Sequence, residues 1–327
     1  MDQKKRALII GISGQDGAFL SQFLLNKNYE VHGSSRDAQQ TRFEGLNQLG
    51  IKNQVSLHSL NTKDFRNILE IFMKVLPDEI YNLSGQSSVG LSFEQPVETF
   101  ESIAVANLNI LEVIRFLKLK TKFYNAGSSE CFGETPLEGA NETTAFNPQS
   151  PYAIAKATAF WQIANYRKSY GLHCCTGILF NHESYLRPER FVTQKIIKTA
   201  VRIAQGSKET LELGNINISR DWGWAPDYVQ AMWIMLQTAI PQDFVVATGK
   251  NHSLETFVIT VFEQLNLDYK KHVRINASFN RPTDISFGLG DPHRISKTLG
   301  WKPTFSFKKI IEEMVNYELK KTTSSFI

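Results

Sequence analysis

The stretch RALIIGISGQDG, residues 6–17, carries the strongest structural signal in the chain. Its apolar first half has no helical period, which predicts a strand over 6–12. Gly11, Gly14 and Gly17 follow, and apolar residues then recur at helical spacing over 18–26. Glycines between a strand and a helix permit a tight turn and let the backbone approach a pyrophosphate at the helix N-terminus. The stretch therefore predicts a dinucleotide-binding turn.

Strands and helices continue to alternate after this turn. The patterns predict strands over 29–34, 55–57, 79–83, 121–126 and 173–181, and helices over 65–76, 97–117 and 153–170. Strands that alternate with helices form a parallel sheet covered on both faces. Because crossover connections are right-handed, we expect an α/β fold with a doubly wound parallel sheet of the Rossmann type.

The pattern loosens after residue 181. Helices are predicted over 192–205, 227–238, 254–265 and 307–318, with only short strands between them. We interpret residues 1–180, with returning segments at about 215–250, as the Rossmann domain. The remainder of 181–327 is expected to form a smaller C-terminal lobe that binds the substrate.

Composition excludes several classes of protein. The 327 residues are 42% hydrophobic and 21% charged, which is ordinary for a globular chain. No apolar stretch approaches the roughly 20 residues of a membrane helix, so we expect no membrane partner. A net charge of +4 without a basic block argues against nucleic acid.

The cysteines and the N-terminus bear on the compartment. Cys131, Cys174 and Cys175 have no metal-ligand spacing, so they favour buried thiols in a reducing compartment and predict no metal site. The first apolar run is too short for a signal peptide. We therefore expect a cytoplasmic location.

The end of the second predicted strand bears on the choice of cofactor. An NAD site usually has an acid there, whereas an NADP site has an Arg for the 2′-phosphate. The chain has Ser35 and Arg36, both of which can donate to a phosphate. Asp37 follows directly and leaves NAD open. We favour NADP.

Four residues form a candidate catalytic group. Tyr152 and Lys156 are four residues apart and share one face of a predicted helix. A nearby ammonium lowers the pKa of a phenol, so we expect Tyr152 to act as a base near neutral pH. Ser128 follows the strand over 121–126 and can hold a sugar oxygen beside Tyr152. Glu130 adds a second acid–base group, although a single Glu in a turn can also be a surface carboxylate.

With these motifs the chain resembles the extended short-chain dehydrogenase/reductase superfamily and, within it, the GDP-mannose 4,6-dehydratase family. The matching phrases run along almost the whole chain. They are GQDG at 14–17, YNL at 81–83, SPYA at 150–153, GILFNHES at 177–184, FVT at 191–193, RDWG at 220–223, RP at 281–282 and LGWKP at 299–303.

The resemblance implies an internal redox reaction on GDP-mannose or a related nucleotide sugar. Tyr152 would take the proton of the sugar 4-hydroxyl while NADP accepts the C4 hydride. Glu130 would then remove the C5 proton and help water to leave from C6, and the hydride would return to C6. The product would be GDP-4-keto-6-deoxymannose. Two proton transfers at different carbons need two acid–base groups, which this pair supplies.

The resemblance also implies two sets of binding residues. The cofactor set adds Ser13, Gln15, Asp16, Asn61, Leu83 and His182 to the glycines, Ser35, Arg36, Tyr152 and Lys156. The substrate set is Gln86, Ser87, Asn181, Val192, Lys195, Arg220, Arg281 and Asp284. The basic members of this second set supply the cations that a diphosphate needs.

The chain departs from the family pattern at five positions. They are Asn61 where Asp is usual, Ser128 for Thr, Tyr185 for Pro, Gln194 for Arg and Asp284 for Glu. The hydroxyl at Ser128 keeps its expected role, and the other changes affect the surroundings of the substrate and cofactor.

Other readings remain open. A UDP-sugar decarboxylase, an epimerase or a 4-keto reductase would share the fold, although epimerases and reductases need no second base such as Glu130. A non-catalytic NADP-binding regulator is a rival from another class.

The resemblance also implies a homo-oligomer. In the superfamily that the chain resembles, the helices corresponding to 97–117 and 153–170 pack against the same helices of a second subunit. We therefore expect either a dimer or a tetramer.

Overall fold

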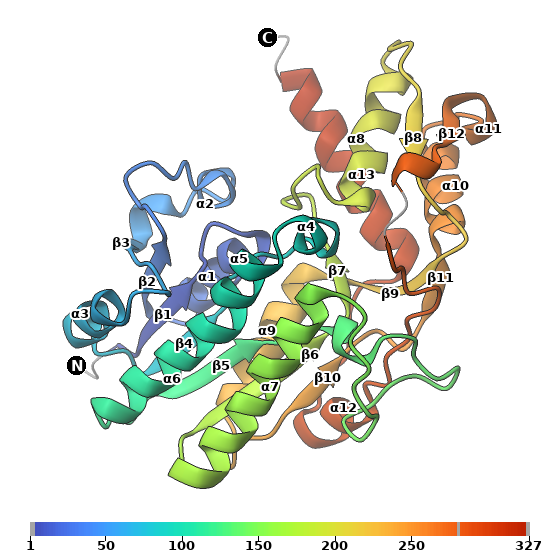
Figure 1. Ribbon diagram of the computed structural model, residues 1–327. Coiled ribbons are helices and arrows are strands. Elements are labelled where there is room, and N and C mark those ends of the chain that lie inside the picture. The colour runs from blue at the N-terminus through green and yellow to red at the C-terminus, as the bar shows by residue number, and fades with distance from the viewer. Residues whose placement is uncertain (1–3, 280–281, 325–327) are drawn as a thin grey trace.

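The computed structural model of the protein describes residues 4–279 and 282–324. Its largest feature is a seven-stranded sheet in the order β10-β6-β5-β4-β1-β2-β3, with every neighbouring pair parallel (Figure 1). The strands are β1 Arg6–Ile10, β2 Glu30–Ser35, β3 Ser56–Ser59, β4 Glu79–Asn82, β5 Lys122–Ala126, β6 Cys174–Leu179 and β10 Phe244–Val246. The strands β2 and β3 are added on one side of β1, and β4, β5, β6 and β10 on the other. The connections that follow β1 and β4 therefore lead to opposite faces of the sheet, and this leaves a crevice at the C-terminal ends of these strands.

Helices cover both faces of this sheet. One face packs against α1 (Gln15–Asn26) and α9 (Ala225–Leu236), whose apolar side chains join one core. The other face packs against α3 (Phe65–Val75), α6 (Ala106–Phe116) and α7 (Pro151–Tyr170). The predicted doubly wound α/β fold is therefore confirmed.

A smaller group of elements lies beyond the C-terminal ends of the strands (Figure 1). Its core is formed by α8 (Val192–Ala204), α10 (Leu254–Gln264) and α13 (Phe307–Ser324). Two small sheets accompany them, with orders β11-β9-β7 and β12-β8. These strands are β7 Asn181–Glu183, β8 Leu211–Leu213, β9 Ser219–Trp224, β11 Asn251–Ser253 and β12 Val273–Ile275. The proposed domain boundaries stay a prediction.

The remaining elements are short and were not anticipated from the sequence. They are α2 Glu44–Gln48, α4 Val89–Glu94, α11 Tyr269–His272, α12 His293–Leu299, η1 Lys52–Gln54, η3 Ser129–Phe132 and η4 Ala277–Phe279. No helix in the described part of the chain is long and apolar enough to cross a membrane.

Two predicted elements differ in the structure. The helix expected over 97–117 is interrupted, because a π-helical turn at Glu101–Val105 (η2) separates α5 (Pro96–Phe100) from α6. The strand expected over 173–181 is divided at Phe180, because β6 stays in the large sheet while β7 pairs with β9. This division carries the chain from the large sheet toward the smaller group of elements.

Close packing of α1 on β1 depends on Gly17. A Cβ atom at Gly17 would lie 2.5 Å from Ile12 Cα and 2.6 Å from Ile12 O, so the backbone itself would have to move. We predict that Gly17→Ala lowers the free energy of unfolding by about 1–3 kcal/mol, as overpacking does. Chemical denaturation measures this loss.

Gly14→Ala is the matched control. Its Cβ would meet nothing nearer than Gly11 O at 3.7 Å, so its stability should stay within about 1 kcal/mol of the wild type. Equal stability of the two variants would contradict the packing account.

Candidate active site

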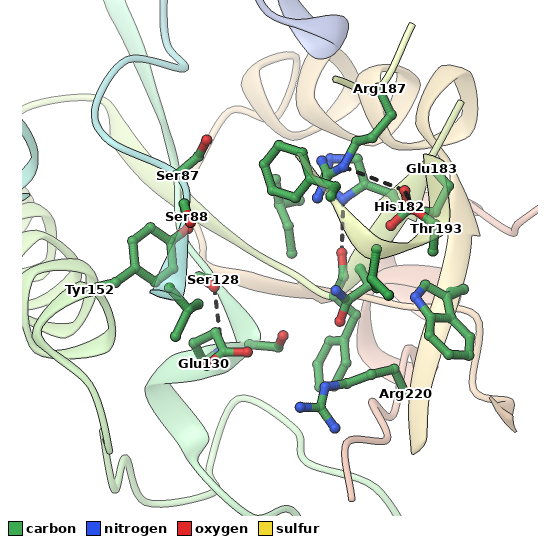
Figure 2. A pocket seen from close by; sticks show the side chains of 18 of the residues that line it. Ser87, Ser88, Ser128, Glu130, Tyr152, His182, Glu183, Arg187, Thr193 and Arg220 are labelled. Carbon is green, nitrogen blue, oxygen red and sulfur yellow. Dashed lines mark hydrogen bonds and ion pairs between the residues drawn. The ribbon is translucent and has the colours of Figure 1, made fainter. Parts of the chain in front are cut away.

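A cavity of about 400 Å³ lies at the C-terminal ends of the large sheet's strands. Its lining comes from segments far apart in the sequence, and Figure 2 shows side chains from these segments around the cavity. The segments are 83–89 after β4, 126–130 after β5, 179–183 after β6, and 187–195 and 213–222 from the smaller group. Parallel α/β sheets bind ligands at this edge, as expected from the sequence.

The four predicted catalytic residues all line this cavity. Ser128 ends the loop after β5, and its hydroxyl accepts a hydrogen bond from Glu130 N at 3.3 Å (Figure 2). Ser150 caps the N-terminus of α7 by accepting from Ala153 N at 3.1 Å, which brings Tyr152 to the first turn of that helix. One turn later, the Lys156 ammonium donates to Ala126 O at 2.7 Å.

Burial controls the protonation of this group. Burial raises the pKa of the Tyr152 phenol. A hydrogen bond with the Ser128 side chain lowers this pKa, but the net shift is upward. Burial also lowers the pKa of the Lys156 ammonium to about 8. The expectation that the nearby Lys156 ammonium lowers the pKa of the Tyr152 phenol is therefore wrong, because the net shift is upward. The ammonium lies 5.8 Å from the centre of the phenol ring and binds a carbonyl instead.

The glycine-rich turn has the shape that a pyrophosphate needs. Gly11 has a φ of +89°, and a Cβ there would lie 2.8 Å from Leu83 O, so the turn packs tightly on the end of β4. The space beside Gly14 is open, and Gly14 is the N-cap of α1 without a side-chain cap. The N-terminal amides of α1 therefore border room for an anion.

Gln15 and Asp16 join this turn to the segment after β6. Gln15 Nε2 donates to His182 O at 2.9 Å and Gln15 Oε1 accepts from Ser184 Oγ at 2.8 Å. Asp16 Oδ2 pairs with His182 Nε2 at 2.9 Å. Burial raises the pKa of Asp16, but His182, Arg187 and Gln15 together outweigh it and the net shift is downward. For His182, burial lowers the pKa and Asp16 reverses this to a net rise, so the pair favours its charged form.

The remaining predicted cofactor residues lie outside this cavity's lining. Ser13 is exposed in the turn. Ser35 Oγ shares a hydrogen bond with Thr41 at 3.0 Å, and the Arg36 side chain is 85% exposed with Nη1 3.9 Å from Glu98. Asn61 Oδ1 accepts from Lys63 N at 3.1 Å. Ser35 ends β2, Arg36 follows it, and Asn61 comes after β3, farther along the same edge of the sheet.

The predicted substrate residues line the cavity apart from Arg281, which lies outside the described residues. Lys195 donates to Glu212 O at 2.7 Å, and its ammonium lies 4.3 Å from the centre of the Phe279 ring. Arg220 Nη2 donates to Asp284 Oδ1 at 3.3 Å. The other members that line the cavity are Gln86, Ser87, Asn181 and Val192.

Two further arginines line the cavity and were not proposed from the sequence. Arg187 Nε lies 3.4 Å from Glu183 Oε2, a carboxylate that also accepts from Thr193 at 2.6 Å (Figure 2). Arg190 Nη2 donates to Ser87 Oγ at 3.1 Å. The sequence signal for them is that Arg187 and Arg190 lie three and six residues after Ser184, the end of the 181–184 phrase.

Comparisons with known proteins agree with this geometry. A profile of the family described as GDP-mannose 4,6 dehydratase matches residues 8–314. GDP-mannose 4,6 dehydratase 1 of Arabidopsis thaliana is 43% identical, over 97% of this chain and 90% of that protein. GDP-mannose 4,6-dehydratase of Vibrio cholerae is 41% identical, over 97% of this chain and 94% of that protein.

A solved structure supports the fold. DesIV, a dTDP-glucose 4,6-dehydratase from Streptomyces venezuelae with NAD and TYD bound, superposes with a TM-score of 0.87. The alignment covers 98% of each chain at 18% identity, so it bears on the fold alone. The family match, in contrast, rests on sequence along nearly the whole length, and the chain belongs to the GDP-mannose 4,6-dehydratase family.

Proposed function

We propose that this protein is a GDP-mannose 4,6-dehydratase that converts GDP-mannose to GDP-4-keto-6-deoxymannose and water, with NADP as cofactor. The observation that carries the proposal is the position of Glu130. It lines the same cavity as Ser128, Tyr152 and Lys156, so a second acid–base group accompanies the first. The family supports the substrate, and two proton transfers at different sugar carbons account for the two groups.

The residues of the glycine-rich turn fit a dinucleotide. The open space beside Gly14 and the uncapped N-terminus of α1 would hold the pyrophosphate, and Leu83, Lys156 and His182 would border the nicotinamide half. When bound, the oxidised nicotinamide would accept a hydride from the sugar and return it, and its positive charge would lower the pKa of a neighbouring phenol. Arg36 is the proposed partner of the 2′-phosphate, because its guanidinium is exposed after β2.

Tyr152 is the proposed base of the first step. Its raised pKa keeps the phenol protonated near neutral pH until charges beside it change. Ser128 would orient the sugar 4-hydroxyl toward the phenol oxygen. The Lys156 ammonium donates to Ala126 O, which holds it beside the cavity that Tyr152 also lines. When Lys156 is protonated, it adds positive charge there.

Glu130 is the proposed acid–base group of the second step. Once C4 is a ketone, the hydrogen on C5 is acidic, and a carboxylate can remove it. The same carboxyl group can then give a proton to the departing C6 hydroxyl, so that water leaves and Glu130 returns to its starting state. The Ser128 hydroxyl accepts a hydrogen bond from Glu130 N. The hydroxyl proposed to orient the sugar for Tyr152 therefore also holds the backbone of Glu130.

Return of the hydride to C6 also requires a proton at C5. The proton that Tyr152 took from the 4-hydroxyl, which exchanges with solvent, would supply it and restore the phenolate acceptor.

The end of the cavity with basic side chains suits a nucleoside diphosphate. Lys195 and Arg220 line the cavity, as do Asn181 and Val192. Guanidinium and ammonium groups bind phosphate oxygens through charge-assisted hydrogen bonds. The diphosphate would therefore lie at this end, with the sugar toward Tyr152.

Glu130 also separates the main alternatives. An epimerase or a 4-keto reductase of this fold needs no second base, and a regulator needs no acid–base set. A UDP-sugar decarboxylase can use a carboxylate at the position of Glu130, so this residue does not separate it from a dehydratase.

A cytoplasmic location stays a prediction that the three buried thiols favour.

The first test replaces the two acid–base groups one at a time. Wild-type protein with GDP-mannose should yield the 4-keto-6-deoxy product without net consumption of NADPH. Glu130→Gln should transfer the C4 hydride and then stall, because only the second base is missing. NADPH absorbance should appear as a single burst no larger than the enzyme concentration, with product reduced roughly 100-fold or more.

Tyr152→Phe is the matched control, since it should show no burst. Near-normal product from Glu130→Gln would make Glu130 a surface carboxylate. Turnover of UDP-glucuronate alone in a panel of nucleotide sugars, or a requirement for stoichiometric NADPH, would reject the dehydratase proposal.

The second test concerns cofactor choice. Arg36→Ala should weaken NADP binding by about 1.5–3 kcal/mol, because a charged hydrogen bond to the 2′-phosphate is lost, and should leave NAD binding nearly unchanged. Titration of each cofactor by calorimetry measures the difference. An equal loss for both cofactors would show that Arg36 does not bind the 2′-phosphate.

The third test concerns assembly. We infer a homo-oligomer, because large apolar side chains are exposed on the neighbouring helices α5, α6 and α7. They include Val97 at 68%, Ile154 at 48% and Trp161 at 62% exposure. Sedimentation at micromolar concentration should give a dimer or tetramer, and Trp161→Glu should shift it toward monomer. Leu137→Glu changes an exposed residue in a loop outside these helices and should leave the oligomeric state unchanged. A monomeric wild type would reject the inference.

A further inference from the structure

Residues 284–291, which we call the strap, lie directly against Arg220. The strap begins with Asp284, which accepts from Arg220 Nη2 at 3.3 Å. Farther along, a Cβ atom at Gly288 would lie 3.2 Å from Arg220 Cδ, so the strap backbone rests on the stem of the arginine. The strap therefore contacts both the stem and the guanidinium of Arg220, whose Nη1 also donates to Ser219 O at 2.9 Å.

The strap is held by backbone pairing with Ser219, through Ser219 N to Ser286 O at 2.8 Å and Gly288 N to Ser219 O at 3.0 Å, and also by Glu134. The two carboxylate oxygens of Glu134 accept from consecutive backbone amides, Ser286 N and Phe287 N, the second at 2.9 Å. The neighbouring Thr135 Oγ1 accepts from Leu289 N at 2.9 Å. A carboxylate that accepts from backbone N–H groups forms charge-assisted hydrogen bonds, which are stronger than bonds between neutral groups.

The chain between Glu130 and Glu134 is fixed by close packing. Gly133 has a φ of +68°, and a Cβ there would lie 2.4 Å from Asn147 O. A side chain is excluded at this point, and the backbone turns sharply between the two glutamates. A small cavity of about 10 Å³ is bounded at once by Glu130, Arg220 and strap residue Gly288. The catalytic segment, the arginine and the strap are thus packed neighbours.

We propose that Glu134 is a positioning residue for substrate binding. By holding the strap, it keeps Asp284 on Arg220 and so orients the guanidinium toward the diphosphate of the nucleotide sugar. It also links that end of the site to the segment that carries Glu130. The proposal rests on the proposed function, because it assigns Arg220 to a nucleoside diphosphate.

The test compares binding with chemistry. Glu134→Ala removes both acceptors, and we expect the KM for GDP-mannose and the Kd for GDP to rise about tenfold, the scale of one lost charge-assisted hydrogen bond. The Kd for NADP and the single-turnover rate of C4 hydride transfer at saturating GDP-mannose should change less than about twofold. Glu134→Gln keeps one acceptor oxygen and should recover part of the GDP affinity.

Glu138→Ala is the matched control, since this residue is exposed in the same loop. It should leave all four quantities at wild-type values. Amide hydrogen exchange should become faster at Ser286 and Phe287 in Glu134→Ala but not in Glu138→Ala.

Two outcomes would overturn the proposal. An unchanged Kd for GDP in Glu134→Ala, in an enzyme whose wild type converts GDP-mannose, would reject the role of Glu134 and leave the proposed function intact. Equal losses of GDP affinity and NADP affinity, together with a lower unfolding temperature in both Glu134 variants, would show a general structural role. A wild type that binds GDP but does not convert GDP-mannose would reject the proposed function, while the GDP titrations would still decide the role of Glu134.

Discussion

The site depends on the hydrogen bonds that join the turn after β1 to the segment after β6. Gln15 binds both His182 and Ser184, and Asp16 binds the His182 ring. Gln15, His182 and Ser184 are buried, so these bonds are shielded from water and each would be costly to break. Because β7 begins at Asn181, the same contacts fix where the chain leaves the large sheet. The glycine-rich turn and the segment after β6, both beside the cavity, are therefore held together.

Burial then determines how the chemistry is tuned. It raises the pKa of Tyr152 and lowers that of Lys156, so both groups favour their neutral forms more than they would in water. A phenol of this kind is a weak base until positive charge is brought beside it. In the proposed reaction, proton transfer by Tyr152 would therefore depend on a complete site.

Sequence patterns predicted the elements whose signals are local. The strand, turn and helix around Gly14, the shared face of Tyr152 and Lys156, and the position of Ser128 after β5 all follow from short-range spacing and strand order. The π-helical turn at Glu101–Val105 has no such signal. The raised pKa of Tyr152 could not be predicted from the sequence, because its cause is burial, which is a property of the folded chain.

The missed features arise from contacts distant in sequence. Arg187 and Arg190 reach the cavity because the chain after β7 folds back over it, which no local pattern indicates. Tyr185, a departure from the family pattern, stacks on Tyr317 with ring centres 4.2 Å apart and packs edge-on against Phe19. Its role is to pack α13 against the rest of the protein, and only the tertiary structure could reveal it.

In the proposed reaction, one hydride leaves C4 of the sugar and returns to C6 of the same molecule. The direct measurement uses GDP-mannose with deuterium at C4 and locates the label in the product by NMR and mass spectrometry. Internal hydride transfer should place deuterium at C6 and a solvent-derived hydrogen at C5, with the cofactor unchanged after many turnovers. Loss of the label to solvent or to free cofactor, or a product that keeps deuterium at C4, would contradict it.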